Sequence, residues 1–397
     1  MEIERAEYKN YYPLSKLHIN EPNKKTEFNI DFGDNFCSSK FQFYISGKLT
    51  KNDGNDYDNK SNIKLINNFV PFLFSKIEVR KHNKLIEEIE NPGQLSTIKG
   101  TITYSKSDNV SQTGFESDFK GKFEAIGNLS HFGLGFFENV NIPIYKGGFN
   151  ITFIRSEDND AIFRWKSKKE DGTFDNSTLP SSGKITIDEF FIRVPIISYK
   201  TTSKIQLINE ITKKEKLSFH FNHWQCIEQK NITGKTYNFD ITNIYRNINN
   251  PKFIIVGFQK GRLNDQEYDT SIFDHMHVKN IRVKLNGQYY PDELMNLDID
   301  GEKYRIIYQM YQDYKKVYYD CNNMYYNPKE FIEKRTLYVI DTTKTPVNIS
   351  NSKNDIIINV DFEYDILLTS KTNCYVVVLS ERLLEYNVLK NDILEIK

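Results

Sequence analysis

A strand-turn-strand pattern occurs twice in this chain, half a chain apart. The two copies are residues 69–88 and 273–292. Ile77-x-Val79 of the first copy corresponds to Ile281-x-Val283 of the second, at a spacing of 204 residues. The turn residues His82-Asn83 then correspond to Asn286-Gly287, and Asn-Gly between alternating apolar residues is the strongest short hairpin signal. An internal repeat determines the overall architecture of a chain, so it is considered before any other pattern. The repeat here predicts a duplicated β-domain.

A second pair of matching segments supports the duplication. Ile196-Ile197-Ser198-Tyr199 corresponds to Leu383-Leu384-Glu385-Tyr386 at a spacing of 187 residues. The 397 residues also exceed the roughly 250 to 300 that one hydrophobic core usually organises. We therefore predict two β-domains, residues 1–200 and residues 217–397, joined by a linker at residues 201–216 that can be helical.

Apolar and polar residues alternate strictly in both halves of the chain. Examples are Phe28-x-Ile30-x-Phe32, Phe41-x-Phe43-x-Ile45, Leu217-x-Phe219-x-Phe221 and Ile356-x-Ile358-x-Val360-x-Phe362. Alternation places one face of a strand in a core and the other in water. Short strands separated by Asn, Gly and Asp turns favour antiparallel sandwiches or barrels, whereas a parallel sheet needs a helix after nearly every strand. The sequence therefore predicts an all-β fold.

A few helices are expected in the second half. Tyrosines and aliphatic residues recur at helical spacing through residues 302–319, which predicts a helix with one apolar face on a sheet. Asn327-Pro328-x-Glu330 is typical of an N-cap with proline at the first helical position, and it predicts a shorter helix to about Lys334.

Two polar stretches, residues 104–121 and 157–183, interrupt the first half. We expect long exposed loops there, and such loops on a rigid β-scaffold are where contacts with partners usually lie. Phe163 and Trp165 within the second stretch are unusual for a solvent loop, so a short strand or a partner is expected to bury them.

The charges of the chain balance, with 53 Lys and Arg against 53 Asp and Glu. A neutral chain has no global field for a nucleic-acid backbone or an anionic membrane, so no sequence-specific nucleic-acid recognition is expected. Cys37, Cys226, Cys321 and Cys374 form no CxxC pair, which favours reduced thiols over a zinc ribbon or disulfides. The amino terminus lacks the apolar stretch of a signal peptide and no segment is long and apolar enough to span a bilayer, which indicates synthesis in the cytoplasm.

His275-x-His277 is the pair that most resembles a metal site, because alternate residues on a strand point the same way. Cupins use such a pair, but their motif adds a Glu shortly after it and a later His, whereas Lys279 to Arg282 follow here and no His lies beyond position 277. Zinc requires three or four ligands, so a structural role is favoured. His220-x-x-His223 is weaker still, because the two rings would face opposite sides of a strand.

Two further motifs fail on spacing. Gly234-Lys235-Thr236 resembles the end of a phosphate-binding P-loop, but Gln229 stands where that loop needs a glycine. Asp298-x-Asp300-Gly301 suggests a calcium loop, but the glycine comes too early and the bidentate Glu is out of register, which favours a solvated turn. No GxSxG is present, and spacing nominates no Ser/His/Asp or Cys/His set. We therefore predict no catalytic, cofactor-binding or metal-binding residues, and no enzyme.

The second half resembles the double jelly-roll major capsid proteins of Polinton-like and adintovirus-like DNA viruses and integrated elements. The segments that carry the resemblance are Phe258-Gln259-x-Gly261-Arg262, Phe273-Asp274, Ile281-x-Val283-x-Leu285-Asn286, Tyr290-Pro291, Asn296-Leu297-Asp298, Tyr318-Tyr319, Val339-Ile340-Asp341 and Glu385-Tyr386-Asn387. The first half contributes Phe136-Phe137, Ile142-Pro143-Ile144 and Ile151-Thr152-Phe153. The resemblance implies two tandem antiparallel jelly-roll sandwiches, an N-terminal one and a C-terminal one.

The resemblance also implies a structural role in a virion capsid. Three chains would form a pseudo-hexagonal capsomer, and capsomers would tile an icosahedral shell around double-stranded DNA, with a single jelly-roll penton or minor capsid protein as partner. Two other functions stay open from the residues. One is a jelly-roll carbohydrate-binding module that uses the loops at 104–121 and 157–183, and the other is a cupin-like metalloprotein built on His275 and His277.

Overall fold

The computed structural model describes most of the chain. The described residues are 2–15, 18–108, 110–141, 143–213, 216–242, 251–320, 323–344, 356–387 and 392–396. Cys321, Ile142 and part of the predicted linker lie outside this set. None of the described helices combines the length and the apolar character that a membrane-spanning helix needs.

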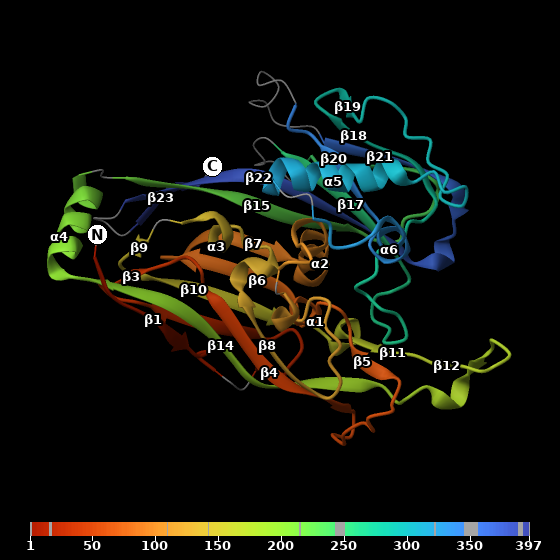
Figure 1. Cartoon of the computed structure of the whole chain (residues 1–397), viewed down its shortest axis with the longest axis horizontal. Coiled ribbons are helices and arrows are strands. Elements are labelled where there is room, and N and C mark those ends of the chain that lie inside the picture. The colour runs from red at the N-terminus through yellow and green to blue at the C-terminus, as the bar shows by residue number, and fades with distance from the viewer. Residues whose placement is uncertain are drawn as a thin grey trace. The chain divides into compact units, whose positions relative to one another are not determined.

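The first sandwich consists of two antiparallel sheets (Figure 1). One sheet has the order β8-β4-β14-β1, extended beside β14 by β3 and β9; its strands are β1 (Ile3–Tyr11), β3 (Phe36–Cys37), β4 (Gln42–Lys51), β8 (Lys122–Asn128), β9 (Ile144–Tyr145) and β14 (Gly183–Tyr199). The facing sheet has the order β2-β10-β6-β7, with β2 (Lys25–Asp31), β6 (Phe74–Lys81), β7 (Lys84–Glu90) and β10 (Gly148–Arg155).

The second sandwich repeats this plan. One sheet has the order β15-β22-β17-β20, with β23 paired to β22; its strands are β15 (Leu217–Gln229), β17 (Phe253–Lys260), β20 (Leu337–Asp341), β22 (Thr372–Asn387) and β23 (Asp392–Ile396). The other sheet has the order β16-β21-β18-β19, with β16 (Gly234–Asp240), β18 (Val278–Leu285), β19 (Gln288–Tyr290) and β21 (Ile356–Ile366).

The two sandwiches match strand by strand along the chain. In chain order β1, β2, β4, β6, β7, β8, β10 and β14 correspond to β15 to β22, and within these two sets of eight each strand has the same neighbours as its counterpart. The repeated segments of the sequence fall on the equivalent hairpins β6-β7 and β18-β19, and the second pair of anchors falls on the ends of β14 and β22. The predicted all-β fold with two jelly rolls is therefore confirmed.

Burial follows the alternation of the sequence. In β2 the apolar residues Phe28 and Ile30 are 1% and 0% exposed, while the polar residues between them face water. Four rings, Phe28, Phe74, Phe153 and Phe190, pack on one another with centroids 4.9 to 5.8 Å apart and fill the space between the two sheets. Phe74 and Phe190 are stacked, and the other contacts are edge to face or tilted. Such aromatic pairs add to the free energy gained from burying their area.

The two predicted helices of the second half are confirmed. α5 (Arg305–Tyr319) buries Ile307, Tyr311 and Tyr314 and lies against β20 (Figure 1). α6 (Pro328–Lys334) begins with a capping box, in which the Asn327 side chain accepts from the Glu330 N–H at 2.9 Å and the Glu330 carboxylate accepts from the Asn327 N–H at 3.0 Å.

Four further α-helices occur among the described residues. They are α1 (Phe69–Phe72), α2 (Pro92–Thr103), α3 (Phe136–Asn139) and α4 (Thr201–Lys213). α4 occupies the predicted linker. α2 was not predicted, because its residues are buried on nearly all sides and carry no amphipathic period.

The polar stretches are more ordered than expected. In the first, Phe115 is fully buried and a 3₁₀ turn covers Ser111–Thr113. The second contains β11 (Ile162–Arg164), which pairs with β5 (Ile63–Leu65), and a small hairpin of β12 (Ser167–Lys168) and β13 (Phe174–Asp175). Phe163 lies in β11 and stacks on Trp165 at 5.5 Å, with both rings half-buried. The expectation of long exposed loops was therefore wrong in part, because apolar residues in each stretch pack against the sandwich. The short strand expected at Phe163 is β11.

The chain forms two compact units. One comprises residues 1–93, 110–223 and 382–397, and the other comprises residues 94–109 and 224–381. Two segments, 94–109 and 382–397, thus belong to the unit formed mainly by the opposite half of the chain. The division into 1–200, 201–216 and 217–397 stays a prediction about the repeat in the sequence.

Candidate functional site

An open pocket of about 750 Å³ lies in the second sandwich. The turn that precedes β18 forms one wall, and the end of β21 with the residues after it forms another. Asp274, His275, His277, Tyr364 and Ser370 contribute polar groups to the lining. Ionisable and hydroxyl groups around one hollow make this the candidate site of the unit.

The structure brings His275 and His277 together, but not in the predicted way. Both residues lie in the turn before β18, and Met276 and His277 have left-handed φ angles of 50° and 47°. The ring centroids are 4.4 Å apart, and the His277 N–H lies 3.2 Å from the Nδ1 of His275, to which it donates. The prediction that the two rings share one face of a strand was therefore wrong, because a turn and not a strand sets their directions.

His275 and Asp274 are neighbours in the pocket lining, and each is in a different electrostatic environment. Burial, followed by the nearby His277, lowers the pKa of His275 below its ordinary 6.5, although Asp274 and Asp300 act in the opposite direction. Asp274 is already engaged, because its carboxylate accepts from Arg262 Nε at 2.9 Å, from the other end of the Arg262 guanidinium and from the Lys260 N–H at 2.8 Å. Asp274 is thus held in place by Arg262 and the Lys260 backbone, and it lines the pocket together with His275.

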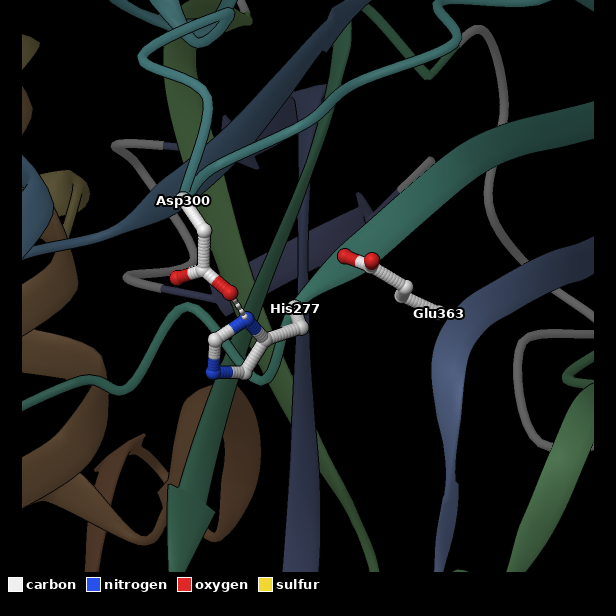
Figure 2. Close-up of side chains that lie close together, drawn as sticks. All are labelled: His277, Asp300 and Glu363. Atoms are coloured by element: carbon white, nitrogen blue, oxygen red, sulfur yellow. Dashed lines mark ion pairs between the residues drawn. The ribbon is translucent and has the colours of Figure 1, made fainter.

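His277 faces a different set of groups. Its Nδ1 lies 3.3 Å from Oδ2 of Asp300, and the Glu363 carboxylate points toward this pair (Figure 2). One ligand-capable atom from each of the three side chains lies within 4.8 Å of the others. His277 and Glu363 are half-buried and Asp300 is exposed. The Glu363 charge also raises the pKa of the adjacent Tyr364, whose ring packs against His277 at 5.3 Å.

Sequence reasoning missed this cluster. Asp300 belongs to the motif that the sequence assigned to a solvated turn. That turn is confirmed: the Asp298 side chain accepts from the Gly301 N–H at 2.8 Å, and the Asp298 carbonyl accepts from the Lys303 N–H at 2.7 Å. Glu363 lies 86 positions after His277 and carries no local motif. Only the pairing of β18 with β21 brings the two together.

The remaining candidate motifs have structural positions. Gly234-Lys235-Thr236 begins strand β16 and forms no phosphate loop. His220 is exposed and His223 is buried on β15, so the two rings face opposite sides as predicted. The three described cysteines, Cys37, Cys226 and Cys374, are buried thiols without a disulfide.

Exposed apolar side chains occur on two elements of the first compact unit, β1 and α4. Along β1 nearly every side chain is exposed, including Ile3 at 55% and Tyr8 at 46%, and among the described residues β1 pairs with β14 alone. On α4, Ile205 is 54% exposed beside a hollow of about 480 Å³ lined by Phe36, Tyr199 and Ile208. We call β1 and α4 together the edge surface.

The duplicated sandwich defines a class of proteins in which two jelly rolls follow each other in one chain. The sequence pattern of the double jelly roll-like domain matches residues 63–384, and the chain belongs to this family. The resemblance to double jelly-roll proteins is thereby confirmed. Comparison with proteins of curated function gives no match.

Solved structures with this fold include three viral proteins. VP54 of the virus PBCV-1, as fitted into a reconstruction of the virophage Sputnik, has a TM-score of 0.63 and 9% identity, over 98% of this chain and 96% of that chain. The major capsid protein of Faustovirus has a TM-score of 0.59 and 10% identity, over 97% and 90%. The major capsid protein of mavirus has a TM-score of 0.59 and 9% identity, over 98% and 90%. At such identities the similarity is one of fold.

Proposed function

We propose that this chain is the major capsid protein of a double-stranded DNA virus or of a related integrated element, of the Polinton-like or adintovirus-like kind. The observation that carries the proposal is the strand-by-strand duplication within one chain, in a fold that aligns with 90% of the major capsid protein of Faustovirus and 90% of that of mavirus. The role is structural and non-enzymatic, and the protein acts in the virion shell after synthesis in the host cytoplasm.

The working unit is a homotrimer with a pseudo-hexagonal outline. Each chain supplies two sandwiches with the same strand order, so three chains around a three-fold axis supply six similar bodies. Lateral contacts between such capsomers are then nearly equivalent, which allows a closed icosahedral shell to form by self-assembly. A single jelly-roll penton or minor capsid protein fills the vertices.

The edge surface supports an assembling role. A long exposed edge strand presents unpaired backbone groups that pair readily with another chain, and soluble monomers usually avoid one. β1 is such a strand, and α4 in the same compact unit adds the exposed Ile205. Contacts with neighbouring chains would cover both.

The balanced charge limits the interaction with the packaged DNA. With 53 basic and 53 acidic residues the chain offers no large positive field, so contacts with DNA are weak and independent of sequence. Strong binding of purified protein to duplex DNA at physiological salt would contradict this part of the proposal.

Light scattering coupled to size-exclusion chromatography tests the capsomer directly. The purified full chain should elute with the mass of a trimer or a larger assembly, and negative-stain images should show capsomers or shells. A chain that stays monomeric at high concentration across salt and pH would overturn the proposal. Specific binding of that monomer on a glycan array would instead favour the carbohydrate-binding module.

A further inference from the structure

We propose that His277, Asp300 and Glu363 form a binding site for a divalent transition metal ion, with zinc as the best fit. The three side chains come from three separate segments of the second sandwich: the turn before β18, the turn at Asp298–Lys303, and β21. The inference goes beyond the capsid role and does not depend on it. It also replaces the expectation from the sequence that the chain has no metal site.

The backbone holds the three segments at fixed positions. The Glu363 N–H donates to the His277 carbonyl at 2.9 Å, which sets the two ligand residues side by side across β18 and β21. The Leu297 N–H donates to the Lys279 carbonyl at 2.8 Å, and the Asn280 side chain accepts from the Asn296 N–H at 2.8 Å. These bonds attach the start of the Asp300 turn to β18. The ligand residues are therefore preorganised by hydrogen bonds that do not involve their own side chains.

The contact between His277 and Asp300 has the dimensions of two ligands on one ion. Zinc bonds to His nitrogen and carboxylate oxygen are about 2.0 to 2.2 Å long, so two ligand atoms in a tetrahedron lie roughly 3.3 to 3.5 Å apart. The Nδ1 of His277 and Oδ2 of Asp300 are 3.3 Å apart. That Nδ1 atom is buried and makes no hydrogen bond, although a carboxylate lies so close to it. A shared cation between the two atoms would satisfy both.

Glu363 completes the set by a small movement. Its nearest carboxylate oxygen lies within 4.8 Å of the other two ligand atoms, and the side chain points toward them in Figure 2. A change of side-chain rotamer can bring the oxygen to the distance that a tetrahedral site needs. Within the described part of the chain no Lys or Arg forms an ion pair with Asp300 or Glu363. Two carboxylates without a permanent positive partner favour a bound cation.

The ligand set selects the metal. One imidazole and two carboxylates suit zinc and similar ions, with water in the fourth position, whereas calcium takes six to eight oxygen ligands. His275 is left out of the set because its Nδ1 already accepts the His277 N–H, and the compact group consists of His277, Asp300 and Glu363. This separates the proposed site from a site built on the His275 and His277 pair.

Zinc titration of the tag-free full chain, freed of metal by chelator and dialysis, tests the proposal. Isothermal titration calorimetry and elemental analysis after equilibrium dialysis should both give one zinc ion per chain. His277→Ala, Asp300→Asn and Glu363→Gln should each weaken binding by at least roughly tenfold. His275→Ala and His220→Ala are the matched controls, and both should bind zinc like the wild type. Cobalt substitution should give the intense visible absorption of a tetrahedral site.

The outcomes separate the alternatives. Absence of stoichiometric zinc binding up to about 1 mM would overturn the proposal, and so would zinc binding that His275→Ala abolishes while Glu363→Gln leaves it intact. Asp300 and Glu363 are not buried, so their amide variants should fold, and melting without zinc checks this. At a zinc concentration near the wild-type Kd, zinc should raise the melting temperature of the wild type clearly more than that of Glu363→Gln. The trimer assay above is independent, so either proposal can fail alone.

Discussion

The Glu87 carboxylate lies 3.5 Å from Nδ1 of His223 without forming a hydrogen bond, and both side chains are buried. Glu87 instead accepts the backbone N–H groups of Gly135 at 3.0 Å and Phe136 at 2.8 Å. Burial, and secondly the positive charge of Arg382, holds the pKa of His223 well below its ordinary 6.5. A buried carboxylate thus lies beside a buried imidazole whose protonation in the folded chain is disfavoured.

His223 should make the chain sensitive to acid. In the unfolded chain the imidazole takes up a proton near pH 6.5, but in the folded chain it does not, so the unfolded state binds more protons at lower pH. The free energy of unfolding should therefore fall below about pH 6.5 by up to about 1.4 kcal/mol per pH unit from this residue. Denaturant unfolding at pH 5 and pH 7.5 measures it.

His223→Leu is the matched variant, because neither ring nitrogen of His223 makes a hydrogen bond. It should unfold with a shallower dependence on pH than the wild type between pH 5 and 6.5. His220→Leu, at an exposed position of the same strand, should leave the dependence unchanged. Parallel profiles for the wild type and His223→Leu would contradict the assignment.

Lys81 should make the stability of the chain depend on pH in the alkaline range. Burial lowers the pKa of Lys81 from 10.5 to about 8, although Cys37 and Asp31 act to raise it. The amine packs on the rings of Phe149 and Tyr386, each with its centroid 5.0 Å away. Between pH 8 and 10.5 the unfolded chain holds one more proton than the folded chain, so stability should rise with pH in this window, by about 3 kcal/mol in total.

Lys81→Met isolates the contribution of Lys81 to the free energy of unfolding, since the variant and the wild type share all other titrating groups. Relative to the wild type, Lys81→Met should be most stable below pH 8, and its advantage should shrink toward pH 10.5. Chemical denaturation at three pH values in this range measures the difference. A difference that does not change with pH would show that Lys81 titrates normally.

The repeat was predictable because it depends on local chemistry. Each hairpin is specified by residues only a few positions apart: the alternation in Ile77-x-Val79 or Ile281-x-Val283 and a two-residue turn. Both hairpins form where the sequence predicts them. The Asn327 capping box is likewise contained in four residues. Patterns of this kind survive folding because each element needs only its own neighbours to take the predicted shape.

Features that depend on distant pairing were not predictable. Glu363 meets His277 because β21 pairs with β18, and the left-handed turn at Met276 and His277 replaces the strand geometry that alternation suggests. Helix α2 was missed for a related reason, since a helix buried on nearly all sides has no polar face to mark its period. In each case the tertiary surroundings override the local signal.

The two equivalent hairpins differ in the strain of their turns. His82 and Asn83 have φ angles of 49° and 64°, and Asn286 and Gly287 have 49° and 89°, so both turns need two left-handed residues. Glycine adopts left-handed φ angles without strain, whereas a residue with a β-carbon adopts them at a cost in free energy. Asn83→Gly should therefore stabilise the first hairpin and Gly287→Ala should destabilise the second, each by about 0.5 to 1 kcal/mol. Thermal unfolding of both variants measures this, and effects of the same sign would contradict it.

Ile205 should contribute to assembly and not to the stability of the chain. Its side chain is 54% exposed on α4, so Ile205→Glu removes little buried area within the chain and should change the unfolding free energy by less than about 0.5 kcal/mol. If the edge surface is covered in the capsomer, the same change should weaken each contact by about 1 to 3 kcal/mol, which is roughly 5- to 150-fold in the association constant. Gln206→Glu, which adds the same charge at the next exposed position of α4, is the control.

Analytical ultracentrifugation over a dilution series should show dissociation of Ile205→Glu at concentrations where Gln206→Glu and the wild type remain trimeric. Equal association of all three proteins would mean that α4 faces solvent in the assembled state, and the contact would then have to be sought along β1.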